Sequence, residues 1–246
     1  MSGTFYVVGV GPGDPELLTL KAVKRLQQAT IIYLPISRLS RQTWLSDAVQ
    51  SHATADCAIR PVEFSLGSDS QQRQDHWQWV ATEIIAELRR GVDVAFVTLG
   101  DSLLYSTSIY LLRALRQQWP EAPVEIVPGI AAYSHVAALT EFTIGEGEQP
   151  VTILPTVMDR SALREGIKKG GALVLMKIGK RLPQIIDLLD EFELLEHAVF
   201  VARAGLPDQR IETDLNNLRD ADDKAGNLAV ILVDTTARQN VRQLFD

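Results

Sequence analysis

The sequence is poor in cysteine and histidine and has no long apolar run. Cys57 is the single cysteine, so an internal disulfide is excluded. The four histidines have no paired spacing, and we therefore predict no metal site. No apolar run approaches the roughly 20 residues that span a bilayer, and no basic leader segment precedes the first apolar stretch. We expect a cytoplasmic protein without a membrane segment.

The chain also lacks an excess of positive charge. Lysine and arginine number 24 against 31 aspartates and glutamates, which gives a net charge of −7. This balance disfavours a nucleic-acid partner, because binding a polyphosphate depends on many cationic contacts. An anionic small molecule stays possible, since a local arginine cluster binds carboxylates whatever the net charge.

The length of 246 residues and the alternation of apolar strands with helical stretches predict two α/β domains. We place the boundary between residues 1–127 and 128–246. In the second half the intervals between strands are shorter and more variable, which predicts a mixed sheet there. The expected strands are 4–10, 30–34, 58–64, 93–98, 124–127, 151–154, 172–176, 198–201 and 228–233. The expected helices are 44–52, 77–90, 108–118, 130–139, 161–169 and 182–191.

A further helix follows the first strand, and the sequence offers two starting points for it. It can begin at Asp14, with Pro15 in the first turn, or begin again at Thr19. The apolar residues Leu20, Val23 and Leu26 predict the face that covers the sheet.

The stretch Leu99–Thr107 is the strongest candidate for a functional site. It follows residues 93–98, which have the composition of a buried parallel strand. Ligands of open α/β sheets bind beyond the carboxyl ends of strands, so Gly100 and Asp101 indicate a site there. The alternative is an ordinary turn in which Asp101 caps a helix.

The first turn, Gly9–Pro15, does not fit a dinucleotide-binding site. The dinucleotide fingerprint requires glycine at position 14, where this chain has Asp14, and a carboxylate would repel a pyrophosphate. The second expected strand runs into Pro35 rather than ending in an acidic residue. Both features disfavour the binding of NAD or FAD. The remaining feature of this segment is a stiff turn, at which the backbone can approach an uncharged or cationic ligand.

Five motifs spread over nearly the whole chain resemble those of the tetrapyrrole (class III) methyltransferases that act in corrin synthesis. These motifs are Gly9–Ala22, Leu99–Thr107, Val127–Ile130, Val174–Lys177 and Arg203–Pro207. Within that family, three runs are most similar to the branch that methylates carbon 20 of precorrin-2 or of its cobalt-loaded counterpart. They are Leu-Leu-Tyr-Ser-Thr at 103–107, Gly-Glu-Gly-Glu at 145–148 and Arg-Ala-Gly-Leu-Pro at 203–207.

The resemblance implies a homodimer that binds the methyl donor S-adenosylmethionine in a cleft between two α/β domains. The donor-binding residues that it implies are Pro12, Gly100, Asp101, Leu104, Ser106, Thr107, Ala131, Ala132, Met176 and Ala204. Carboxylates of an anionic tetrapyrrole substrate require cationic partners, and Arg38, Arg41, Lys177 and Arg203 lie nearest the expected strand ends. Asp101 is the candidate general base; the alternative is that it only orients the loop or the donor.

Position 102 departs from the family, which usually has Gly-Asp-Pro where this chain has Ser102. A serine loosens the turn and adds a donor that must find a partner. Other readings stay open: a methylase of another corrin position or of uroporphyrinogen, a ribosomal RNA ribose methylase, and a methylase of a modified protein histidine. A non-catalytic module that binds the donor or a tetrapyrrole is the alternative outside enzymology.

Overall fold

The computed structural model describes residues 1–37, 43–64, 70–156, 160–222 and 224–239. The chain divides into two compact units, Met1–Ala131 and Ala132–Asp246. The first unit therefore includes the four residues after position 127, where the sequence analysis placed the boundary. Among the described residues, no helix combines the length and apolar character needed to cross a membrane.

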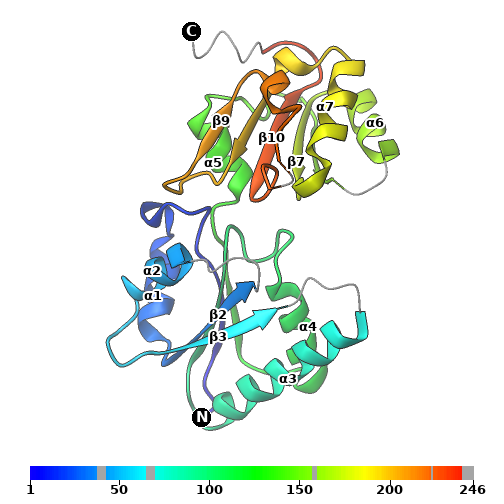
Figure 1. Ribbon diagram of the computed structural model, residues 1–246. Coiled ribbons are helices and arrows are strands. Elements are labelled where there is room, and N and C mark those ends of the chain that lie inside the picture. Colours follow the sequence, from blue (N-terminus) through cyan, green and yellow to red (C-terminus); the bar gives the residue numbers. More distant parts are fainter. Residues whose placement is uncertain (38–42, 65–69, 157–159, 223, 240–246) are drawn as a thin grey trace. The chain divides into compact units, whose positions relative to one another are not determined.

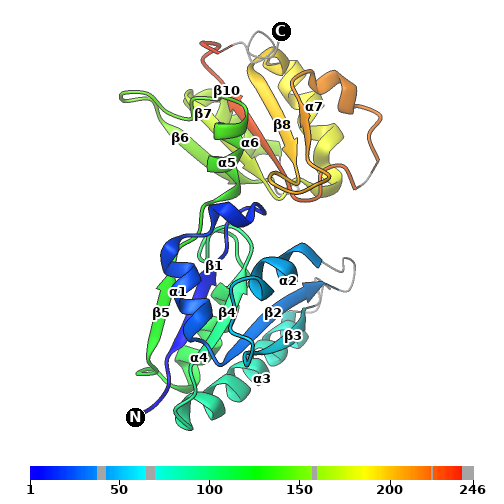
Figure 2. The same cartoon turned by 90° about the vertical axis from the view of Figure 1, so that its left-hand side faces the viewer.

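The N-terminal unit contains a five-stranded parallel sheet in the order β3-β2-β4-β1-β5 (Figure 2). Its strands are β1 (Phe5–Gly9), β2 (Ile31–Ser37), β3 (Ala58–Phe64), β4 (Val94–Thr98) and β5 (Val124–Val127). β1 and β4 are buried along their whole length, as expected for central strands covered on both faces. β2 continues through Pro35, where its partner is β3 alone, so the missing N–H of proline interrupts no pairing with β4.

Helices cover both faces of this sheet (Figure 1). On one face, α1 (Leu20–Gln28) and α2 (Thr43–Gln50) pack against Tyr6 and Val8 of β1. On the other, α3 (Ser70–Arg89) and α4 (Ser108–Gln118) pack against Phe5 and Val7. The alternation of side chains along β1 thus divides the core into two layers.

Both predicted starting points after β1 are used. Asp14 caps the short 3-10 helix η1 (Pro15–Leu17) by accepting from the Glu16 N–H at 2.8 Å. Thr19 then caps α1 by accepting from the Ala22 N–H. The predicted apolar face was wrong at Leu20, which is 81% exposed, because Ala22 and Leu26, one turn apart, are the residues that face the sheet.

The C-terminal unit contains a five-stranded sheet in the order β6-β7-β10-β8-β9. Its strands are β6 (Val151–Pro155), β7 (Ala172–Met176), β8 (Ala198–Ala202), β9 (Arg210–Glu212) and β10 (Ala229–Asp234). β6 and β7 are parallel and the other pairs are antiparallel, so the predicted mixed sheet is confirmed. β9 was not predicted, because three residues with two charges at the sheet edge carry no apolar pattern.

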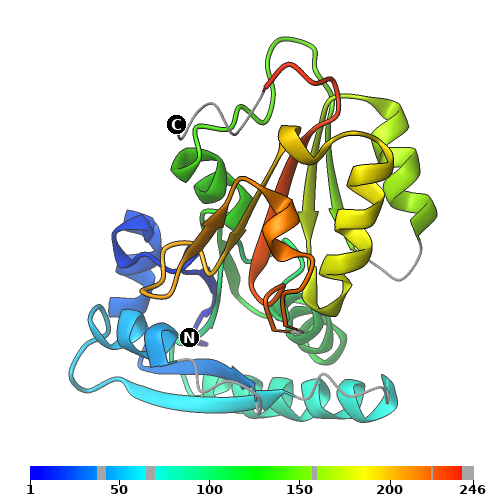
Figure 3. The ribbon, with the colours of Figure 1, turned by 45° about the horizontal axis from the view of Figure 1, so that its top comes forward.

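Helices of this unit also lie on both faces of its sheet (Figure 3). α6 (Arg160–Lys169) and α7 (Leu182–Glu191) pack on one face, and α5 (Ala132–Leu139) packs on the other. Three further 3-10 turns, η2 (Gly179–Arg181), η3 (Leu195–His197) and η4 (Leu215–Leu218), connect the strands.

Candidate functional site

Three glycines meet at the carboxyl ends of β1, β4 and β5. A Cβ on Gly9 would lie 2.7 Å from the Gly100 carbonyl oxygen, and one on Gly129 would lie 2.2 Å from the same oxygen. Gly100 also exchanges two backbone hydrogen bonds with Gly11. These distances leave no room for a side chain, so glycine allows three strand ends to pack backbone against backbone. We call Gly9, Gly100 and Gly129 the glycine junction.

Asp101 links the loop after β4 to this glycine junction. One carboxylate oxygen accepts a hydrogen bond from the Leu103 N–H at 2.9 Å, within its own turn. The other accepts from the Gly129 N–H at 3.2 Å, 28 residues further along the chain. Both oxygens thus hold main chain, as in the alternative in which Asp101 orients its loop; the long-range partner Gly129 is what the sequence did not reveal.

A chain of buried hydroxyl groups holds the same loop against the end of β4. The Ser106 hydroxyl lies 2.8 Å from the hydroxyl of Thr98 at the end of β4 and 2.8 Å from the hydroxyl of Ser108. Ser108 in turn donates to the Ser102 carbonyl oxygen. The predicted donor-binding residue Ser106 is therefore buried in a network that fixes the loop to the start of α4.

Ser102, the departure from the family motif, is 1% exposed. A buried serine hydroxyl needs a hydrogen-bond partner, but within the described part of the chain the Ser102 Oγ has none. The Ser102 N–H likewise has no hydrogen bond among the residues that the structure describes. A buried hydroxyl without a partner is costly, so this atom is either a source of instability or a group available to a ligand.

We expect Ser102→Pro to raise the free energy of unfolding by about 0.4–1 kcal/mol, because proline restricts the unfolded chain and no bond of the Ser102 N–H is lost. Ser102→Ala serves as the control, since it removes the orphan hydroxyl without restricting the backbone. Chemical denaturation of the three proteins measures the effect. A destabilised Ser102→Pro beside a neutral Ser102→Ala would contradict the expectation and show a backbone angle that proline cannot adopt.

The other predicted donor-binding residues of the N-terminal unit flank the glycine junction in sequence. Pro12 follows Gly11 and is buried, and Ala131 lies two residues after Gly129. Leu104 and Thr107 are partly exposed, and Thr107 precedes α4 without a side-chain capping bond. The geometry thus places these residues along the loops that leave β1, β4 and β5.

The C-terminal unit brings its three predicted donor-binding residues to one face of its sheet. Ala132 begins α5, Met176 ends β7, and Ala204 follows β8. All three belong to the apolar cluster on the α5 face, with Ala204 buried and the other two partly buried. Their joint placement could not be read from the sequence, in which they are far apart.

The predicted substrate-binding cations have different environments. Lys177 and Arg203 follow β7 and β8, and both adopt positive φ angles of 57° and 53°. Lys177 retains exposed surface, yet desolvation by the surrounding protein lowers the pKa of its ammonium group. Arg203 is paired in its own loop, where its Nε lies 2.7 Å from a carboxylate oxygen of Asp208. Arg38 and Arg41 lie outside the described residues.

The glycine junction and its loops carry no lysine or arginine in residues 9–15, 99–107 or 128–131. Within the part of the chain that the structure describes, no group of three histidine, cysteine, aspartate or glutamate residues is placed to hold a metal ion. What the loops offer is backbone, the carboxylates of Asp14 and Asp101, and hydroxyl groups, of which the buried Ser102 Oγ has no partner among the described residues. This chemistry suits a ligand without phosphate groups.

A solved structure of a cobalt precorrin-4 methyltransferase has the same fold, with a TM-score of 0.73, 22% sequence identity and coverage of 94% of both chains. The likeness assigns the protein to a class built from one parallel and one mixed α/β unit. The family model of the tetrapyrrole (corrin/porphyrin) methylases matches residues 4–219, and the chain belongs to this family. The predicted resemblance and fold class are therefore confirmed.

Two curated relatives are similar over nearly their whole length. The cobalt-precorrin-2 C(20)-methyltransferase of Salmonella typhimurium is 29% identical and covers 89% of this chain and 92% of the relative. The precorrin-2 C(20)-methyltransferase of a Sinorhizobium species is 30% identical, with coverage of 94% and 95%.

Proposed function

We propose that the protein transfers a methyl group from S-adenosylmethionine to carbon 20 of precorrin-2 or of its cobalt-loaded counterpart. The observation that carries this proposal is the near full-length similarity to two C(20)-methyltransferases. The runs at 103–107, 145–148 and 203–207, which resemble those of this branch, support the same proposal.

The residues of the glycine junction fit the proposed donor. S-adenosylmethionine supplies an electrophilic methyl group on a sulfonium, and it contains no phosphate that would need a cationic cradle. The orphan Oγ of Ser102 offers a hydrogen bond to the donor's polar groups. We assign donor contacts to Pro12, Gly100, Asp101, Leu104, Ser106, Thr107, Ala131, Ala132, Met176 and Ala204.

The protein's contribution to the methyl transfer is mainly orientation. The displacement requires the methyl group and the acceptor carbon to be held in line, and positioning alone can supply most of the acceleration. Asp101, with both oxygens bonded to main-chain N–H groups, holds the loop in place in this proposal. S-adenosylhomocysteine leaves as the carbon–methyl bond forms, and the methylated carbon must then lose the hydrogen that it carried; Asp101 is the candidate acceptor of this proton.

The proposed substrate is an anionic tetrapyrrole, and its carboxylates need cationic partners. We assign this role to Arg38, Arg41, Lys177 and Arg203. Arg203 would exchange its pairing with Asp208 for a substrate carboxylate, a replacement that costs little because Asp208 is exposed.

The test of the proposed reaction is incubation with S-adenosylmethionine carrying a ¹³C-labelled methyl group. Precorrin-2, its cobalt form and uroporphyrinogen are offered separately, and NMR locates the label. We expect a new methyl group on carbon 20 of one of the first two compounds. A label on another carbon, or on uroporphyrinogen alone, would assign the protein to a different branch of the family.

A homodimer is part of the proposal, and light scattering would then give twice the chain mass of 27.2 kDa.

We also expect the protein to bind S-adenosylhomocysteine and not NAD. Asp14 occupies the position at which a pyrophosphate would need glycine, and its carboxylate is held at the start of η1. Titration calorimetry measures both ligands under the same conditions. Measurable heat with NAD, and none with S-adenosylhomocysteine or S-adenosylmethionine, would contradict the proposal.

A further inference from the structure

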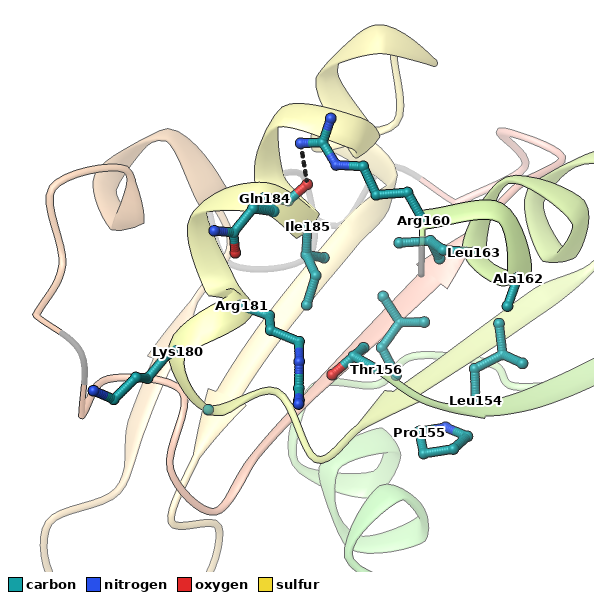
Figure 4. A pocket seen from close by; sticks show the side chains of 12 residues that line it. Leu154, Pro155, Thr156, Arg160, Ala162, Leu163, Lys180, Arg181, Gln184 and Ile185 are labelled. Carbon is teal, nitrogen blue, oxygen red and sulfur yellow. Dashed lines mark hydrogen bonds between the residues drawn. The ribbon is translucent and has the colours of Figure 1, made fainter. Parts of the chain in front are cut away.

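A cavity lies in the C-terminal unit between α6 and α7, at the carboxyl ends of β6 and β7 (Figure 4). Its volume is about 580 Å³, within the usual range for small-molecule sites. Leu154, Leu163 and Ile185 form an apolar wall, and Thr156 and Pro155 close the end of β6. We call this space the α6–α7 cavity.

The α6–α7 cavity has a cationic rim. Arg181 points toward Thr156, whereas Lys180 points away from the other lining side chains (Figure 4). Arg160 extends along the opposite side and donates to the Gln184 carbonyl oxygen at 3.3 Å. Arg181 donates from Nη1 to the Lys177 carbonyl oxygen at 3.1 Å, which holds the guanidinium at the cavity without neutralising it. Among the described residues, no aspartate or glutamate lines the cavity and none pairs with Arg181. Arg160 is instead paired, because its Nη2 lies 3.9 Å from a carboxylate oxygen of Asp187.

The α6–α7 cavity is on a different face of the sheet from the proposed donor contacts of the same unit. Its wall residues Leu163 and Ile185 belong to the apolar cluster of α6 and α7. Ala132, Met176 and Ala204 belong to the cluster on the α5 face.

We propose that the α6–α7 cavity binds a small organic anion with an apolar body, such as a medium-chain carboxylate. Arg181 would bind the carboxylate by charge-assisted hydrogen bonds, and the leucine and isoleucine wall would contact the hydrocarbon. The anionic end of such a ligand matches Arg181, and its hydrocarbon part matches the apolar wall. A purely charged or a purely apolar ligand would match only one part of the lining. This inference stands independently of the proposed methyl transfer.

The test uses the fluorescent probe 8-anilinonaphthalene-1-sulfonate, which joins an anionic group to an apolar ring system. We expect saturable binding to the full chain that weakens about tenfold in Arg181→Gln, the effect of one charge-assisted hydrogen bond. Ala162→Trp should also weaken binding, because Ala162 lines the cavity and its exposed position tolerates the larger side chain. Arg164→Gln is the matched control: this arginine is on α6 as well, but it pairs with Glu191 and does not line the cavity.

Competition then defines the ligand class. Decanoate should displace the probe, whereas decanol, which lacks the charge, and acetate, which lacks the chain, should not at the same concentration. Equal displacement by decanol or by acetate would overturn the proposal, as would equal probe affinity in all three variants. Displacement by S-adenosylhomocysteine would instead make the cavity part of the donor site and would also overturn it. Circular dichroism of each variant verifies that it is folded.

Discussion

Gly129→Ala should destabilise the N-terminal unit by at least about 4 kcal/mol, the range of the most damaging single substitutions. The new Cβ would lie 2.2 Å from the Gly100 carbonyl oxygen and 2.7 Å from the Gly9 carbonyl carbon. Both neighbours are backbone atoms of central strands or of the loop that follows one, so no side chain can rotate away. Removing this clash requires β5 to move away from β1, and this movement would also break the hydrogen bond from the Gly129 N–H to Asp101.

Denaturant unfolding measures this effect, and Gly147→Ala is the control. Gly147 adopts a φ of +58°, and a Cβ added there would meet no atom within 4 Å, in contrast to one at Gly129. We expect the control to cost about 1 kcal/mol, from the backbone angle alone. A Gly129→Ala protein as stable as the control would show that the three strand ends are not packed backbone against backbone.

Asp101→Asn should lower donor affinity and turnover together. The asparagine oxygen can accept from either the Leu103 N–H or the Gly129 N–H, and its amide then presents a donor to the other. Losing a partly buried charge-assisted bond and leaving an N–H unpaired should cost about 1–3 kcal/mol of stability. Because the loop would lose its link to β5, donor affinity should also fall, about tenfold or more. This decrease corresponds to the same free energy as the loss of stability.

Single-turnover methyl transfer and donor titration, measured on the same preparation, separate the two roles of Asp101. A general base would leave affinity unchanged while the chemical step slows roughly 10²–10⁴-fold. Asp222→Asn is the control, since Asp222 makes the same local bond, to the Lys224 N–H, and has no long-range hydrogen bond among the residues that the structure describes. If Asp101→Asn behaves like this control in affinity and rate, Asp101 has neither role.

The C20 assignment and the stability predictions test different things. Gly129→Ala and Asp101→Asn probe how the loop after β4 is held, and their stability effects do not depend on which carbon is methylated. The labelled methyl group tests the substrate without reference to these bonds. A stable, donor-binding protein that methylates a different tetrapyrrole would therefore preserve the account of the loop and correct the substrate.

Much of the fold could be predicted because its signals are local. The apolar runs of β1, β4, β7 and β8 are short and continuous, as buried strands require, and the alternation with helices predicts α/β units. Asp14 and Thr19 predict helix starts because a cap depends on residues two or three positions away. The start of α3 was placed too late, at residue 77, because its first turns at Ser70–Asp75 are polar and carry no apolar periodicity.

The sequence by itself determined the two α/β units, the mixed character of the second sheet, and the loop after β4 as a candidate site. These follow from hydrophobic spacing and from glycine and aspartate at a strand end. Only the tertiary structure decided that Asp101 bonds Gly129, that Ser102 Oγ has no partner among the described residues, and that Leu20 faces solvent. Such outcomes depend on which strands become neighbours and how closely their backbones approach. Residues far apart in the chain make those contacts, and no local pattern encodes them.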